Sequence, residues 1–135
     1  MTKRFLAVAF ALIFVVLPCG SYADQTLRQV QDYIGKNAPY YMMSPPIMLT
    51  GEVADVYYTG VRNDWQMKIK VDEESALVPL GSDYAYFIAH FSLHLEECPF
   101  KIGDTVMIKG SINSMYSCVM VPMIVVNTIN DGYDF

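Results

Sequence analysis

Three residues whose side chains can bind soft metals lie at helical spacing in the middle of the chain. His90, His94 and Cys98 follow one another at i, i+4 and i+8. On an α-helix this spacing stacks the side chains on one face, where imidazole and thiolate groups can bind zinc or copper. The alternative is that both histidines face solvent and that Cys98 is oxidised. Soft-metal binding is therefore kept as a second hypothesis, and the main prediction includes no metal and no cofactor.

Adjacent acidic residues raise the possibility of acid–base catalysis. One run covers Asp72 to Glu74, and a second consists of Glu96 and Glu97. Neighbouring acids on a turn normally form a solvated surface, and no apolar residues beside them would desolvate a carboxyl group. The sequence also contains no legible Ser-His-Asp order and no glycine-rich phosphate loop. We therefore predict that the protein is not an enzyme.

Aromatic residues lie beside two of the expected loops. Tyr57, Tyr58 and Trp65 flank the first loop, which contains Arg62, and Tyr116 lies in the last loop. Exposed aromatic rings can stack on sugars, on bases or on a protein hot spot. Trp65 instead alternates in phase with a run of apolar residues, which favours a place in the core. The predicted ligand-binding residues are Tyr57, Tyr58, Arg62 and Tyr116.

The elements that would position these residues begin with a helix. In "DQTLRQVQDYIGKNAP", three apolar residues from Leu27 to Ile34 recur at i, i+3 and i+7, which is one face of a helix. Asp24 or Thr26 can cap its start, and a proline ends it. Residues 24–46 are thus predicted to be a helix and an extended linker.

Five strands are expected in residues 47–130. The first loses its alternation around "GEVAD", which predicts a bulge or a sharp coil. Pro79 places the third strand at a sheet edge. The strands are expected at residues 47–58, 65–71, 76–80, 105–112 and 118–129. In-phase alternation predicts a core that contains Trp65, Met67, Ile69, Val106, Ile108, Val119 and Val121.

Residues 82–97 fit two patterns. As a helix, Tyr84, Phe87 and Phe91 share one face, whereas as a strand the apolar residues alternate equally well. The aromatic content favours a strand, and the length favours a helix. We predict a short helix here, between the third and fourth strands. The tail, residues 131–135, is predicted to be flexible.

This order of elements, mainly β with five strands, is that of an OB-fold barrel. The segments "LTGEVADVYY", "WQMKIKV" and "KIGDTVMIKGSI" resemble the small exported bacterial OB-fold proteins, including the group named for its similarity to the tRNA-anticodon-binding domain. The matching parts are Gly51 to Val53 and Gly103 to Gly110, within a resemblance that covers residues 47–129. The resemblance implies an OB-fold-like barrel, whose loops border the usual binding face. The family name implies that its members bind nucleic acid. This chain departs from that implication because it lacks a basic face.

The N-terminus predicts export. Lys3 and Arg4 precede an unbroken apolar run of 13 residues, Phe5 to Leu17, and small residues lead up to Ala23. This pattern is typical of a secretory signal peptide, residues 1–23, and the run is short against the roughly 20 residues of a membrane span. Nothing later in the chain would span a membrane. The protein is therefore expected in the periplasm or the medium after cleavage near Ala23.

Export also determines how the cysteines are interpreted. Lipidation of Cys19 is an alternative fate for the N-terminus, although Pro18 fits that signal poorly. Without the signal peptide, Cys98 and Cys118 remain, and an even pair in an oxidising compartment predicts a disulfide. Closing a loop of this length is worth about 3 kcal/mol in the chain-entropy model.

The charge of the mature chain sets the predicted partner. Removing Lys3 and Arg4 leaves seven basic residues against 14 acidic ones, a net charge of −7. This charge speaks against binding a phosphate backbone or anionic lipid. We therefore predict a non-enzymatic, exported binding module that engages a protein or a glycan through its barrel loops, with no nucleic acid as partner. The alternatives are the soft-metal protein and an oligonucleotide-binding protein, and the sequence makes no prediction of the oligomeric state.

Overall fold

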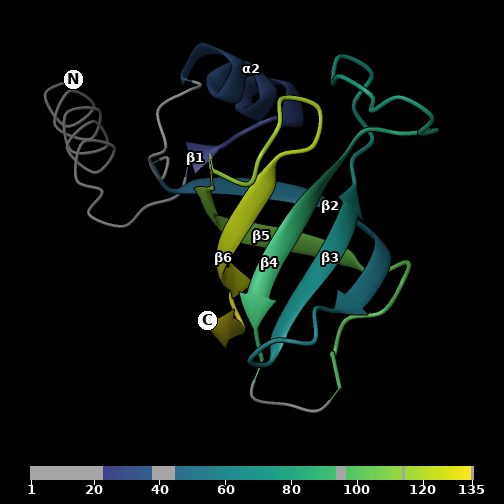
Figure 1. Cartoon of the computed structure of the whole chain (residues 1–135), viewed down its shortest axis with the longest axis vertical. Coiled ribbons are helices and arrows are strands. Elements are labelled where there is room, and N and C mark those ends of the chain that lie inside the picture. Colours follow the sequence, from purple (N-terminus) through teal and green to yellow (C-terminus); the bar gives the residue numbers. More distant parts are fainter. Residues whose placement is uncertain (1–22, 38–44, 94–96, 114, 135) are drawn as a thin grey trace, which may run out of the picture.

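The structure, a computed structural model, describes residues 23–37, 45–93, 97–113 and 115–134 (Figure 1). Within this part of the chain, one helix lies beside a seven-stranded sheet. The helix is α2 (Leu27–Asn37). The five long strands are β2 (Ile47–Tyr58), β3 (Asp64–Lys70), β4 (Tyr86–Ser92), β5 (Thr105–Ile112) and β6 (Met123–Ile129). Two short strands, β1 (Ala23–Asp24) and β7 (Tyr133–Asp134), pair with β2 and β6.

The five long strands close into a barrel. Their order is β2-β3-β4-β6-β5, and a further pairing of β2 with β5 joins the two ends. The first half of β2 pairs with β5 and the second half pairs with β3, and a register shift between Val53 and Asp55 lets β2 bend from one to the other. This confirms the predicted bulge. It also confirms the predicted mainly-β, five-stranded barrel with an N-terminal helix, an architecture consistent with an OB-fold.

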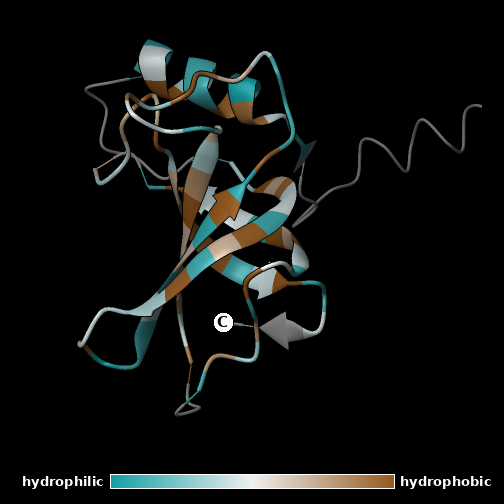
Figure 2. Ribbon diagram, turned by 90° about the vertical axis from the view of Figure 1, so that its right-hand side faces the viewer, coloured by the Kyte–Doolittle hydropathy of each residue, from teal (hydrophilic) through white to brown (hydrophobic). Residues whose placement is uncertain are grey.

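Alternating side chains build the core. Figure 2 shows hydrophobic and hydrophilic residues alternating along the strands. Met67 and Ile69 are fully buried, whereas Lys68 and Lys70 point out of the barrel, so the predicted register of β3 is correct. Of the other predicted core residues, Val106 and Ile108 are buried, whereas Trp65, Val119 and Val121 are half-buried.

Two glycines lie where strands approach closely. A Cβ atom at Gly110 would lie 2.1 Å from the carbonyl oxygen of Val125, and one at Gly51 would lie 2.5 Å from that of Lys70. Gly110 also sits at a register shift between β5 and β6. The glycine in the middle of β5 is therefore required by the neighbouring backbone.

Helix α2 lies across one end of the barrel (Figure 1). As predicted, Leu27, Val30 and Ile34 form its buried face. Its first turn is capped in two ways: the Thr26 hydroxyl accepts from the Gln29 backbone N–H at 3.2 Å, and the Glu73 carboxylate accepts from two N–H groups at 2.8 and 3.0 Å. No helix in the described ranges is long and apolar enough to cross a bilayer.

A buried glutamine attaches α2 to the barrel. Gln31 is 0 % exposed. Its Oε1 accepts from the Leu77 backbone N–H at 2.8 Å, and its Nε2 donates to the Leu77 carbonyl at 2.9 Å and to the Met120 carbonyl at 3.4 Å. These bonds hold the β3–β4 and β5–β6 connections against the helix.

Three predictions of secondary structure are wrong. Residues 86–92 form strand β4 where a helix was predicted, because β3 and β6 offer pairing on both sides. Residues 76–80 form a loop instead of a strand, and residues 118–122 form a turn before β6 begins. Residues 94–96, the end of the predicted helix, lie outside the described residues. In the tail, Tyr133–Asp134 pairs with β6.

The predicted disulfide is absent. Cys98 and Cys118 are separate thiols, the first half-buried and the second exposed. Cys98 precedes β5 and Cys118 follows it, so the eight-residue strand lies between them. A strand of that length spans roughly 26 Å, and a disulfide needs Cα atoms within ~7 Å, so a bridge would require the segments on both sides of β5 to fold back toward each other.

Candidate functional site

The outer surface of β2, β3 and β4 gathers aromatic, basic and amide side chains. Residues directly opposite in the ladder share a face, and Tyr57, Gln66 and His90 form one such row. Lys68 lies in the next row, and Lys70 faces Tyr86 in the one after it. Strands β3 and β4 run side by side (Figure 1). We define the β3–β4 platform as Tyr57, Gln66, Lys68, Lys70, Tyr84, Tyr86 and His90.

The two lysines of the platform lie against tyrosine rings. The Lys68 Nζ is 4.1 Å from the Tyr86 ring centroid and 5.2 Å from that of Tyr84. The Lys70 Nζ is 5.3 Å from the Tyr84 centroid. Such cation–π contacts are worth about 0.5–1 kcal/mol at exposed sites. No ion pair between either lysine and a carboxylate is found in the described ranges, although Glu52 and Asp55 lie opposite them in the β2–β3 ladder.

Tyr57 supplies an exposed, uncharged ring beside these lysines. Its side chain is 38 % exposed. Partial burial raises the pKa of Tyr57 above its ordinary value, Asp55 raises it further, and Lys68 opposes both. The phenol therefore stays neutral at physiological pH and offers a surface on which a planar group can stack.

A row of polar contacts borders the platform near the β2–β3 turn. The His90 Nε2 lies 3.5 Å from Asp64 Oδ2, and the His90 Nδ1 lies 3.3 Å from Gln66 Nε2. Ser92 donates to the other carboxylate oxygen of Asp64. In the tautomer of His90 that carries its proton on Nε2, which the nearby Asp64 carboxylate favours, Nδ1 accepts from the Gln66 amide. Ser92 bonds to Asp64 and not to His90, so the group lacks the nucleophile–base pair of a hydrolase. The absence of enzymatic activity stays a prediction.

The structure separates the four predicted binding residues. Tyr57 belongs to the platform, but Tyr58 points to the opposite face of β2, where its ring lies 5.2 Å from that of Trp65. Arg62 is exposed in the β2–β3 turn with a positive φ of 50°. Tyr116 is 68 % exposed in the β5–β6 connection. That connection follows the end of β5, beside the start of β2, so Tyr116 lies away from the other three.

The spacing argument for a metal site does not apply to this fold. His90 lies on strand β4 and not on a helix, so the i, i+4, i+8 spacing no longer stacks the three side chains. His94 lies outside the described residues. The residues that are described contain no group of three or more histidine, cysteine or acidic side chains placed to hold a metal ion.

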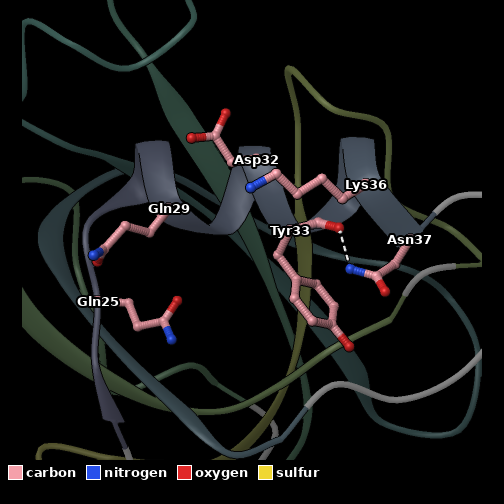
Figure 3. Close-up of a pocket in the computed structure, with 6 residues that line it drawn as sticks. All are labelled: Gln25, Gln29, Asp32, Tyr33, Lys36 and Asn37. Atoms are coloured by element: carbon pink, nitrogen blue, oxygen red, sulfur yellow. Dashed lines mark hydrogen bonds between the residues drawn. The ribbon is translucent and has the colours of Figure 1, made fainter.

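A hollow lies along α2, apart from the platform (Figure 3). Its volume is about 330 Å³, and it is shallow and open to solvent. The Asn37 side chain donates to the Tyr33 carbonyl at 2.7 Å and so caps the end of the helix. The lining residues are Gln25, Gln29, Asp32, Tyr33, Lys36 and Asn37. With one ammonium and one carboxylate and a single ring, this hollow lacks the repeated pairing of rings and cations found on the platform.

Comparison with known proteins finds similarity at the level of structure. No protein-family model matches the chain, and no curated protein sequence matches it. Among solved structures, the chain is similar to a small single-stranded DNA-binding protein from Streptomyces coelicolor. The TM-score is 0.43 and the identity is 17 %, over 70 % of this chain and 95 % of that one.

The exclusion of nucleic acid from the predicted partners is corrected by the arrangement of the platform. The sequence analysis favoured a protein or a glycan, and the charge argument behind that prediction does not describe this face of the barrel. The exclusion relied on the net charge of the whole chain, which averages over every face of the molecule. Lys68 and Lys70 lie together on one face with three tyrosines, and the average conceals that arrangement.

Proposed function

We propose that the protein binds single-stranded nucleic acid on the β3–β4 platform. The observation that carries the proposal is the placement of the Lys68 ammonium 4.1 Å from the Tyr86 ring centroid, with Lys70 and Tyr84 repeating the arrangement beside it. Proteins that bind single strands combine cations for the phosphates with aromatic rings for the bases. The platform presents both on one surface of the barrel.

The platform assigns separate roles to its residues. Lys68 and Lys70 bind phosphate oxygens, and the exposed ring of Tyr57 stacks with a base. Stacking on an aromatic side chain is worth about 1–3 kcal/mol per base. Glu52 and Asp55 lie opposite the lysines in the β2–β3 ladder and weaken the local positive field. Stacking therefore adds to the affinity alongside charge.

Fluorescence anisotropy of a labelled single strand of about 12 nucleotides tests the proposal at low salt. The double variant Lys68→Gln/Lys70→Gln should bind at least about tenfold more weakly than the native protein. The matched control is Lys36→Gln/Lys101→Gln, which removes the same charge from exposed sites off the platform. Equal losses in the two variants, or no binding by the native protein, would contradict the proposal.

We also propose that the protein is exported, as the exported bacterial OB-fold proteins that it resembles are. Lys3, Arg4 and the apolar run to Leu17 support this proposal. Cleavage after Ala23 would leave Asp24 and Gln25 bound to Met48 of β2. Intact-mass measurement of protein from the cell envelope should give a chain that lacks residues 1–23. A full-length mass, or acyl chains on Cys19, would exclude this processing.

A further inference from the structure

We propose that Gln66 makes the platform selective between two classes of base. One class carries an amino group beside a ring nitrogen acceptor, as adenine and cytosine do. The other carries a keto oxygen beside a ring N–H, as thymine and uracil do. The inference rests on the proposed function, because it concerns the same platform and names the feature of the ligand that is recognised there.

The position of Gln66 brings its amide to the edge of a stacked base. Gln66 lies directly opposite Tyr57 in the β2–β3 ladder and on the same outer face. Side chains opposite each other in a ladder have Cβ atoms about 5 Å apart. A base stacked on the Tyr57 ring therefore presents its hydrogen-bonding edge to the neighbouring amide, while Lys68 lies two residues further along β3.

The orientation of the amide is fixed by its neighbours. A carboxylate oxygen of Asp64 lies 3.5 Å from the His90 Nε2 and favours the tautomer that carries its proton there, in which the His90 Nδ1 accepts from the Gln66 Nε2 at 3.3 Å. A primary amide has two N–H donors and one carbonyl oxygen. His90 engages one donor, so the second N–H and Oε1 remain for a ligand. His90 and Asp64 are thus positioning residues for Gln66.

A fixed amide can satisfy only one of the two classes. Its carbonyl oxygen and its N–H stand side by side in a set order. Amino-class bases present a donor and an acceptor in the order opposite to that of keto-class bases on the same edge. One class forms two hydrogen bonds with the amide, whereas the other places donor against donor and acceptor against acceptor. A bidentate pair of this kind typically discriminates between bases at least about fivefold.

Oligodeoxycytidine and oligodeoxyuridine make the sharpest comparison, because the two pyrimidines differ at the amino and keto groups and have nearly the same size. Anisotropy titrations of both, at one salt concentration, should give affinities that differ at least about fivefold for the native protein. Oligodeoxyadenosine and oligothymidine should show a preference for the same class. Gln66→Met keeps the length of the side chain and should bring the ratio of the two affinities close to one.

His90→Phe tests the positioning role. This variant keeps a ring on β4 but removes the acceptor for Gln66, so both pyrimidine strands should still bind while their affinity ratio falls toward one. Gln25→Met, at a residue that lines the hollow along α2 and not the platform, is the matched control and should leave the ratio unchanged. Thermal melts establish that the variants are folded.

The outcomes separate this inference from the proposed function. Equal affinities of the native protein for the two pyrimidine strands would overturn the inference and leave the proposed function standing. The inference alone also fails if Gln66→Met weakens binding to both strands equally. If no strand binds to the native protein, the proposed function and the inference both fail.

Discussion

Gln31 and Leu77 exchange two hydrogen bonds at the end of the barrel that α2 covers. The glutamine Oε1 accepts from the leucine N–H at 2.8 Å, and its Nε2 donates to the leucine carbonyl at 2.9 Å. The side chain of Gln31 thereby supplies the donor and the acceptor that a neighbouring strand would have supplied. The loop that replaces the predicted third strand is held in place by this pair.

Loss of the Gln31 amide should therefore destabilise the fold. Gln31→Leu keeps the volume approximately but removes the partner of the Leu77 N–H and carbonyl at a half-buried position. We expect the free energy of unfolding to fall by about 2–3 kcal/mol, as measured by urea denaturation. Gln25→Leu, at a half-buried site, should change it by less than about 0.5 kcal/mol. Similar values for the two variants would show that the buried pair is unimportant.

Gly110 should not tolerate a larger side chain. In Gly110→Ala the new methyl group would lie 2.1 Å from the Val125 carbonyl oxygen, so β5 and β6 would have to separate. We expect a loss of more than about 3 kcal/mol in stability, or no soluble protein. Gly35→Ala is the control, since its Cβ would be 3.8 Å from Val119, and a helical glycine-to-alanine change should stabilise by about 0.5–1 kcal/mol. An alanine at position 110 with native stability would contradict the observed strand pairing.

The cysteines should titrate as two separate thiols. Ellman's reagent should detect both in the purified, unreduced protein, and Cys118 should react first because it is exposed. Burial raises the pKa of the Cys98 thiol, so less of the reactive thiolate is present below that pKa and its rate should rise as the pH is increased. Cys118→Ser should leave only the slow phase. Detection of fewer than one thiol per chain would restore the disulfide.

The fold could be predicted from the sequence wherever apolar and polar residues alternate clearly within a single strand. Met67 and Ile69 alternate with lysines, and the chain folds in that register. Residues 86–92 could not be assigned in this way, because their apolar residues fit a helix and a strand equally well. Pairing with β3 and β6 decides between the two, and this pairing is a property of the tertiary structure.

The candidate site was only partly predictable for the same reason. Tyr57 was identified because it is aromatic and next to a loop, but Lys68 and Lys70 resemble an ordinary solvated face. Their importance depends on Tyr86, which faces Lys70 only because β4 is a strand. A helix at residues 82–97, as predicted, would not place Tyr86 beside Lys70, so the platform could not be recognised from the sequence.

The proposed stacking of a base on Tyr57 can be tested by comparing alanine variants of Tyr57 and Tyr116, which are both exposed. Tyr57→Ala should weaken the binding of single-stranded DNA about fivefold or more, because one base loses its stacking surface. Tyr116→Ala removes a ring that is even more exposed, at 68 %, but that lies off the platform, and it should leave the affinity unchanged. Anisotropy titrations of both variants check this prediction. A larger loss for Tyr116→Ala would place the ligand on the β5–β6 connection instead.

The salt dependence of binding tests the central claim most directly. Two lysine–phosphate contacts to a single strand predict a slope of about −1.4 in a plot of the logarithm of the association constant against the logarithm of the salt concentration. Lys68→Gln/Lys70→Gln should bring this slope close to zero, whereas Lys36→Gln/Lys101→Gln should leave it unchanged. A native protein without measurable binding, or a slope that both double variants reduce equally, would contradict binding of single-stranded nucleic acid on the β3–β4 platform.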